Sequence, residues 1–426
     1  MRVFVGFNGQ PLFIRLAFFR CYSDIEDNWR YNIPHVWILG SPGVGMRGFM
    51  EYFVTCFKEK NPEFTVVMAS FSRRRQLMKC LVFRPGQDSG EEFNSLPVIP
   101  GPVLNVYDGP PACLPPSGKM VVCTQPLLKE VVEVGVPHST HYFPAWDLEE
   151  LIEANYELEL GLTPSQIKER FSLFGGLVKY CFSTSPSVLT AATRHLTDQI
   201  SQYKRYDDIL LSLRSKRGRK GVVPSLVFHV VPRNERDTHG MVIKFASPRV
   251  ASLVDQQITA RDNSARAKLY RFISGCTVFV DMADWVYKGY CRDRLRGGFF
   301  RLAPLIGSGS PLQLTLSRES FVPSHDRGLD GVVRDYDKQR VYAFRFVRDR
   351  RFVVSVRAVS ELAASNPGWD LLMVWVTAKP CDRRSWDGDF QPDPKCPPED
   401  QAVITWQLDI PQYLLQLDGR FSMHRA

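Results

Sequence analysis

The chain has 426 residues, which is enough for two or three domains of ordinary size. Hydrophobic residues make up 44% of it and charged residues 23%, as in folded globular proteins. This composition excludes a disordered chain, a collagen and a coiled-coil rod. The apolar runs are far shorter than the roughly 20 residues that span a bilayer, so we expect no membrane partner.

The basic side chains are concentrated in the second part of the chain, and the cysteines are scattered along all of it. Residues 1–200 carry 18 basic and 20 acidic side chains, whereas the remaining 226 residues carry 36 and 25. The basic second part favours an anionic partner, most often nucleic acid, with a merely soluble basic domain as the alternative. The ten cysteines form no C-x-x-C pair, which argues against a zinc ribbon and is typical of reduced core residues.

In chain order, the first strong signal is an apolar run over 36–39, followed by a glycine-rich turn and by apolar residues at helical spacing up to Phe57. Continuous apolar runs separated by helix or turn signals predict an α/β fold with a largely parallel sheet. The segment around His138 and His141 has loop-like neighbours, so we expect a plain loop there. Buried strands are predicted over 64–68, 79–83, 103–107 and 120–123, and helices over 147–158 and from Thr163 onward.

The second half begins with a basic segment over 201–221, which is predicted as a linker. Its cluster is typical of a nuclear-import signal or a DNA-backbone contact, with a solvated linker as the plain alternative. The cluster consists of Lys216, Arg217, Arg219 and Lys220. Further on, a helix is predicted around Trp285, a loop over 380–400, and strands over 226–231, 312–316, 329–333, 341–347, 352–356 and 371–376.

The turn after the first strand has the outline of a phosphate-binding loop. Gly40 and Gly45 have the spacing of the Gly-x-x-x-x-Gly-Lys-Ser/Thr motif, in which backbone N–H groups and a helix N-terminus hold phosphates. Met46 stands at the lysine position and Arg47 at the Ser/Thr position, which removes the usual cation and the magnesium ligand. A simple glycine-rich turn is the alternative. The residues expected to contact a nucleotide are Gly40, Ser41, Gly43, Val44, Gly45 and Arg47.

A second candidate ligand follows the strand over 103–107. Asp108 comes directly after it, which is how nucleotide hydrolases present a metal-binding carboxylate. We therefore expect Asp108 to bind Mg²⁺ beside ATP or GTP.

These segments, in this order, resemble the NTPase domain of crinkler effectors, which is shared with retrotransposon hot spot proteins. The resemblance covers roughly residues 33–185 and implies a P-loop NTPase-like domain over 1–200 with a degenerate nucleotide loop. Its more specific parts are Phe-Pro-Ala-Trp-Asp-Leu-Glu-Glu-Leu from Phe143 and Arg-Phe-Ser-Leu-Phe-Gly-Gly-Leu-Val-Lys-Tyr from Arg170. The other parts are Gly-Ser-Pro-Gly-Val-Gly from Gly40, Val-Tyr-Asp-Gly-Pro from Val106 and Met-Val-Val-Cys-Thr-Gln-Pro from Met120.

The same family often continues into a restriction-endonuclease-like α/β domain, expected here over 222–426. The resemblance implies Asp330 as the catalytic, metal-binding acid. It places Lys288 where a glutamate is common, and Arg345 where an acid or glutamine is usual. Such nucleases hold magnesium with two acidic ligands. With one carboxylate left, we expect Lys288 and Arg345 to hold DNA phosphates instead, with solvated strand edges as the alternative.

The resemblance implies a secreted virulence effector that acts in the nucleus of a host cell, although the chain shows no signal peptide. In this hypothesis a degenerate nucleotide-binding domain is coupled to a DNA-binding, non-cleaving domain, a pseudoenzyme. DNA and host nuclear proteins are the expected partners. The alternatives are an active NTP- and metal-dependent DNA nuclease, and a non-catalytic scaffold that binds host proteins.

Overall fold

The computed structural model divides into two compact units, Met1–Met282 and Ala283–Ala426, and each is taken by itself below. The residues that the structure describes are 3–5, 11–72, 74–87, 89–115, 118–126, 137–214, 225–234, 237–259, 262–295, 298–304, 311–316, 321–323, 329–346, 356–377 and 412–417.

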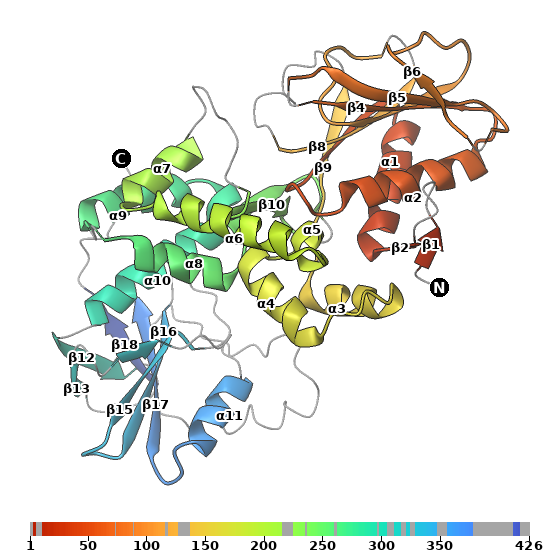
Figure 1. The fold of residues 1–426 in the computed structure, drawn as a ribbon. Helices are drawn as coiled ribbons and strands as arrows, with labels where there is room; N and C mark the ends of the chain where they lie inside the picture. The colour runs from red at the N-terminus through yellow and green to blue at the C-terminus, as the bar shows by residue number, and fades with distance from the viewer. Residues whose placement is uncertain are drawn as a thin grey trace. The chain divides into compact units, whose positions relative to one another are not determined.

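The first unit is built on a seven-stranded sheet with the strand order β6-β5-β4-β7-β8-β3-β9 (Figure 1). All neighbours from β4 to β9 are parallel, and β5 and β6 continue antiparallel at one edge. This confirms the predicted α/β fold with a mostly parallel sheet. The strands are β3 (His35–Leu39), β4 (Thr65–Phe71), β5 (Leu77–Phe83), β6 (Glu91–Phe93), β7 (Val103–Asp108), β8 (Lys119–Thr124) and β9 (His138–Tyr142).

The loop expected around His138 and His141 is wrong, because these residues form β9. Its inward positions are Ser139 and His141, which are polar but buried. A strand whose buried face is polar gives no alternation of hydrophobicity, so the pattern that reveals strands is missing here.

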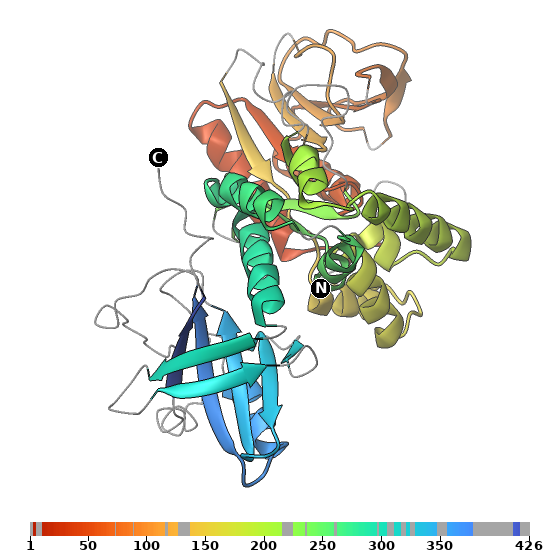
Figure 2. The ribbon, with the colours of Figure 1, turned by 90° about the vertical axis from the view of Figure 1, so that its left-hand side faces the viewer.

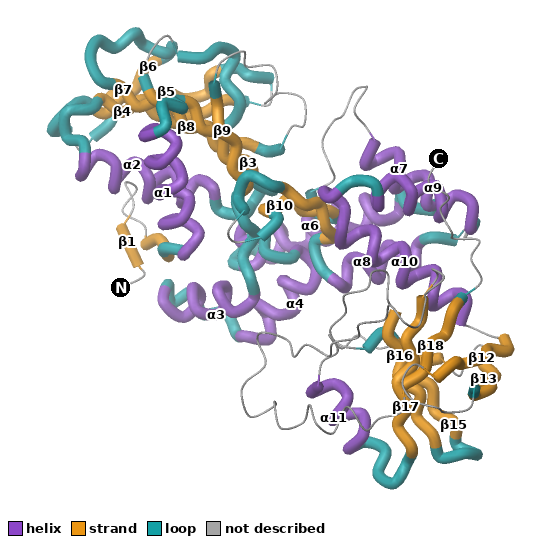
Figure 3. Tube along the Cα trace, turned by 180° about the vertical axis from the view of Figure 1, so that it is seen from behind, coloured by secondary structure: helices purple, strands orange, loops and turns teal. Residues whose placement is uncertain are grey.

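Two helices cover one face of this sheet, α1 (Leu16–Arg30) and α2 (Met46–Lys60), and they lie side by side in Figures 1 and 3. Their interface is aromatic: the rings of Phe18 and Phe49 are 5.7 Å apart, and those of Tyr22 and Phe53 are 5.4 Å apart. Burying rings at this density fixes the start of α2 relative to the sheet. The glycine-rich loop is thereby held at one end of β3.

The predicted helices after β9 are present as α3 (Leu148–Glu157) and α4 (Pro164–Phe174), each with a side-chain cap, from Asp147 and Thr163. The unit also contains the small sheets β1 (Val3–Val5) with β2 (Pro11–Phe13) and β10 (Phe228–Pro232) with β11 (Met241–Phe245). Its other helices are α5 (Val178–Cys181), α6 (Pro186–Ser201), α7 (Tyr206–Arg214), α8 (Pro248–Gln257), α9 (Asn263–Ser274) and η1 (Thr277–Phe279).

The boundary between the units comes later in the chain than the predicted linker over 201–221. Residues up to Met282 belong to the first unit. One reason is that β10 is joined to the glycine-rich loop, since the N–H of Val230 donates to Ser41 Oγ at 3.0 Å. α7 lies inside the predicted linker, and residues 215–221 of the linker lie outside the described residues.

The second unit contains another seven-stranded sheet, with the order β13-β12-β18-β17-β16-β15-β14. β16, β17 and β18 are parallel and the other pairs antiparallel; in Figure 2, β12 and β13 cross in front of the other strands. Its core joins Val341, Ala343, Met373 and Trp375 of the sheet to Val359 of α11. The elements are α10 (Val280–Leu295), β12 (Gly298–Pro304), β13 (Leu312–Leu316), β14 (Phe321–Pro323), β15 (Gly331–Asp335), β16 (Arg340–Phe346), α11 (Val356–Ala364), β17 (Asp370–Thr377) and β18 (Gln412–Gln416).

Two predicted segments of this unit fall largely outside the described residues. Of the strand expected over 352–356, only Val356 is described, and it begins α11. The loop expected over 380–400 is not described at all.

Candidate functional site

The glycine-rich loop lies where its motif predicts, between the carboxyl end of β3 and the first turn of α2. Gly43 and Gly45 have φ angles of 94° and 95°, a left-handed conformation that glycine adopts at little cost. Among the described residues, no side chain caps the start of α2. The N–H groups in the first turn of α2 therefore find no acceptor among the described side chains and point toward the glycine-rich loop. Free N–H groups at a helix N-terminus attract anions.

The side chains of the loop are used to hold it in place. Ser41 is 2% exposed, and its hydroxyl accepts from the Val230 N–H and donates to the Val230 carbonyl at 3.3 Å. Val44 is 1% exposed and packs inward. Because the side chains of Ser41 and Val44 are buried, only the backbone of these two residues is available to contact a ligand.

Two residues that sequence reasoning did not assign to the site brace the loop from behind. Trp146 Nε1 donates to the Val44 carbonyl at 2.9 Å. The N–H of Lys179 donates to the Gly43 carbonyl at 3.1 Å. Both carbonyls are thus directed away from the ligand side. The only sequence signal was that Trp146 and Lys179 stand inside the motifs that carry the family resemblance.

Each glycine of the Phe-Gly-Gly motif lies against another backbone segment, Gly176 against Trp146 and Gly175 against Ala246. A Cβ atom at Gly176 would lie 2.0 Å from the Trp146 carbonyl oxygen, and the Trp146 N–H donates to the Gly176 carbonyl at 3.1 Å. At Gly175, where φ is 57°, a Cβ atom would lie 2.2 Å from the Ala246 carbonyl oxygen. Glycine at both positions lets two backbones approach behind the loop.

A buried arginine holds the other side of Trp146. Arg15 is 2% exposed and forms two hydrogen bonds with the Glu150 carboxylate, at 2.7 and 2.8 Å. Its guanidinium also donates to the carbonyls of Pro144 and Ala145 and lies 4.4 Å from the Trp146 ring centroid. The segment from Pro144 to Glu150, singled out by its sequence, is therefore a rigid support for the loop.

The structure brings Arg47 and Asp108 together. Asp108 ends β7, which is separated from β3 by β8, and the Arg47 Nε atom lies 2.8 Å from its Oδ2 atom. Arg47 is 84% exposed and Asp108 31% exposed. A magnesium ion would need this carboxylate together with a hydroxyl at position 47. The residues therefore do not fit a resident Mg²⁺ at this position.

The thiol below Asp108 is not a reactive group. Burial, reinforced by the charge of Asp108, raises the pKa of Cys123. This cysteine is a neutral core residue.

In the second unit, the predicted cations Lys288 and Arg345 both contact the predicted acid Asp330. Asp330 is 7% exposed; its Oδ1 atom lies 2.8 Å from Lys288 Nζ, and its Oδ2 atom accepts from Arg345 Nη1 at 3.2 Å. The Phe346 N–H donates to the same Oδ2 at 2.8 Å, and Lys288 also lies 3.3 Å from Asp284. Both oxygens of Asp330 are occupied by groups of the chain, so the residues do not fit a metal ion here either.

The predicted cationic cluster of the linker, Lys216, Arg217, Arg219 and Lys220, lies outside the described residues. The charged residues that follow position 200 can still be counted separately for the part that belongs to each unit. Residues 201–282 carry 15 basic and 7 acidic side chains, whereas residues 283–426 carry 21 and 18. Most of the basic excess therefore belongs to the first unit.

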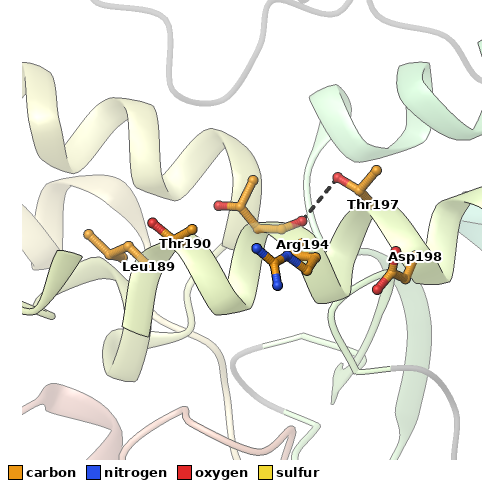
Figure 4. Close-up of a pocket in the computed structure, with 6 residues that line it drawn as sticks. Leu189, Thr190, Arg194, Thr197 and Asp198 are labelled. Carbon is orange, nitrogen blue, oxygen red and sulfur yellow. Dashed lines mark hydrogen bonds between the residues drawn. The ribbon is translucent and has the colours of Figure 1, made fainter. Parts of the chain in front are cut away.

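A hollow of about 470 Å³ lies along the solvent side of α6 (Figure 4). The hydrogen bond drawn among these residues is local, because Thr197 Oγ1 donates to the Thr193 carbonyl one turn earlier at 3.0 Å. The hollow is lined by Leu189, Thr190, Thr193, Arg194, Thr197 and Asp198. Since all six belong to one helix, this is an open surface groove without convergent polar groups.

Comparison with known protein families and with curated proteins finds no match to this chain. Across the described part of the chain, no helix has the length and apolar character needed to cross a bilayer. The same residues contain no group of three or more His, Cys, Asp or Glu side chains placed to hold a metal ion.

Proposed function

We propose that this protein is a crinkler-like effector of the host nucleus whose first unit binds ATP or GTP without turning it over and which contacts DNA without cutting it. The observation that carries the proposal is shared by the two candidate sites. In each, the carboxylate that would hold a catalytic metal ion is paired with a cation of the chain itself. Arg47 pairs with Asp108, and Lys288 and Arg345 pair with Asp330.

Nucleotide binding is supported by the loop and by Arg47 together. The first turn of α2 offers N–H groups to a phosphate, and the exposed Arg47 guanidinium stands next to them. An exposed ion pair such as Arg47 with Asp108 is worth about 0–1 kcal/mol. A guanidinium–phosphate contact is stronger and often bidentate, so a nucleotide can draw Arg47 away from Asp108.

Absence of turnover follows from the same residues. Hydrolysis of a nucleotide needs a cation on the β- and γ-phosphates and a metal ion held by a carboxylate. Met46 supplies no charge, and Arg47 offers a metal ion no hydroxyl ligand, so Asp108 would be left as a single ligand even when a nucleotide draws Arg47 away. The loop keeps the means to bind a phosphate and lacks those for transferring it.

DNA contact rests on charge. Residues 201–282 have the largest basic excess of the chain, and phosphate backbones are bound by such surfaces without base-specific contacts. Lys288 and Arg345 are 29% and 20% exposed, and both pair with Asp330. We therefore propose that they mainly neutralise the carboxylate that would bind the metal ion in an active nuclease. The N–H groups of these two side chains that do not bond to Asp330 would add only a secondary contact to the DNA phosphates.

Equilibrium binding of ATP and GTP to the full chain tests the nucleotide role, in excess EDTA and in excess Mg²⁺. We expect equal affinity in both. Arg47→Ser restores the hydroxyl and frees Asp108, so it should make binding depend on Mg²⁺. Arg30→Ser removes an exposed arginine that pairs with Asp27 on α1, and should behave like the wild type. No binding at millimolar nucleotide, or phosphate release by the wild type, would overturn the proposal.

A salt series of affinity for duplex DNA tests the second part. Phosphate contacts predict an affinity that falls steeply with salt, whereas a flat response would favour a scaffold for host proteins. Incubation of plasmid with Mg²⁺ or Mn²⁺ should leave it intact. Nicking that disappears in Asp330→Ala would instead establish an active nuclease.

A further inference from the structure

A cavity of about 400 Å³ lies in the first unit, and no residue of the glycine-rich loop lines it. Its walls come from one face of α1, the end of β9 with the segment after it, α4, and the β10–β11 hairpin. Buried Phe143, Trp146 and Val231 line it together with exposed Arg233 and Lys244. Mostly apolar walls with a few fixed polar groups, at this volume, are typical of small-molecule sites.

One wall is fixed by a directed chain of hydrogen bonds. The His141 side chain is 2% exposed, and its Nε2 atom lies 2.8 Å from Asn28 Nδ2. Asn28 Nδ2 also donates to the main-chain carbonyl of Asp24 at 2.7 Å. Because Nδ2 is a donor, Nε2 accepts and the ring proton is on Nδ1, 3.0 Å from Thr238 Oγ1. The Thr238 hydroxyl then donates to Asp24 Oδ2 at 3.0 Å. The chain therefore ends on a carboxylate that lines the cavity.

Charges of both signs meet at this cavity. Burial alone would raise the pKa of the Asp24 carboxyl, but the His141 ring, whose Nδ1 atom lies 3.5 Å from Oδ2, and the Thr238 hydroxyl outweigh burial and lower it. Asp24 is therefore an ionised acceptor that is still 35% exposed. Arg20, Arg233 and Lys244 line the same cavity as exposed cations. Arg20 and Arg233 also interact with other groups of the chain, and Arg233 lies 3.2 Å from Asp237.

The cavity is equipped for binding and not for covalent chemistry. Ser139 Oγ lies 3.2 Å from His141 Nε2 but is not among the residues that line the cavity. Cys21 does line it, and burial raises the pKa of its thiol well above the usual value. A thiol that stays protonated is a poor nucleophile. The chain of hydrogen bonds orients Asp24 and activates no neighbouring group.

We propose that this cavity binds a small organic phosphate that carries a flat ring with an N–H or O–H donor, the class of the nucleoside monophosphates. The cations Arg20 and Lys244 match the phosphate, and Asp24 accepts from the ring or sugar. Phe171 and Trp146 supply apolar surface for the ring. The proposal does not depend on nucleotide binding at the glycine-rich loop, because no loop residue lines the cavity, although Trp146 contacts both.

Calorimetric titration of the full chain in EDTA with AMP, GMP, CMP and UMP tests the proposal. We expect at least one to bind, and its nucleoside to bind about tenfold more weakly or worse because the charge-assisted phosphate contact is gone. Asp24→Asn should weaken binding about tenfold by removing the acceptor charge. Ala17→Phe should abolish it by filling the cavity from α1.

Two control variants assign the signal to the cavity. Asp27→Asn lies on the same helix outside the cavity and should keep wild-type affinity for the monophosphate. Arg47→Ser changes the glycine-rich loop and shows whether any of the signal comes from binding there. Melting temperatures show whether each variant is folded. The proposal is overturned if no monophosphate binds at millimolar concentration, or if nucleoside and monophosphate bind equally. It is also overturned if Arg47→Ser loses binding that folded Asp24→Asn and Ala17→Phe retain.

Discussion

Arg15→Met is expected to destabilise the first unit strongly, because the guanidinium is 2% exposed and forms four hydrogen bonds. Removing one partner of a buried ion pair costs about 3–5 kcal/mol. Glu150 is 18% exposed, so water compensates its carboxylate in part, while two carbonyls lose their donors at about 1 kcal/mol each. We therefore expect the free energy of unfolding to fall by about 4 kcal/mol.

Urea denaturation of the full chain, followed by tryptophan fluorescence, measures this change. Arg15→Met combined with Glu150→Gln should recover about 1–3 kcal/mol, because the second change removes the unpaired charge. Arg30→Met, which breaks an exposed pair on the same helix, should stay within about 0.5 kcal/mol of the wild type. A loss below about 1 kcal/mol in Arg15→Met would refute the reasoning that this pair is a buried support.

Other changes test separate features of the two units. Gly176→Ala should cost about 3 kcal/mol or more, because its Cβ would lie 2.0 Å from a backbone oxygen, whereas Gly161→Ala, in open space with positive φ, should cost about 1 kcal/mol. Burial lowers the pKa of His229 to about 3, so this side chain stays neutral in the folded state. The unfolded chain takes up a proton near pH 6.5, so the free energy of unfolding decreases as the pH is lowered below 6.5. His229→Gln should remove about 2 kcal/mol of the loss between pH 6.5 and 5 in denaturation series, and an unchanged slope would contradict this. Lys288→Glu puts a second carboxylate beside Asp330 and should create a Mn²⁺-dependent rise in melting temperature that the wild type lacks.

The parts of the fold that could be predicted are those whose signal is local. The strand, glycine-rich turn and helix around Gly40 and Gly45 are consecutive in sequence, and the strand ending at Asp108 is apolar before it except for Asn105. β9 could not be predicted, because its buried positions are Ser139 and His141. Its polar side chains find partners only in the folded chain.

The contacts that define the candidate sites could not be predicted, because they join distant residues. Arg47 and Asp108 are 61 positions apart, and Ser41 and Val230 are 189 apart. The sequence identified Lys288 and Arg345 as unexpected cations and predicted DNA as their partner, but it did not predict that both would lie against Asp330. A pattern of residue types gives no information about which cation neutralises which acid.

The two margins of the large sheet in the first unit determine how another protein can approach it. At one margin, β6 has only three residues, and two of them are the exposed acids Glu91 and Glu92. At the other, the Tyr142 N–H donates to the Thr238 carbonyl, so the hairpin beside β9 already uses that donor. Short, charged or covered margins discourage strand addition and amyloid-like stacking. These features disfavour strand addition at both margins of the large sheet and favour recognition of partners through side chains and loops there.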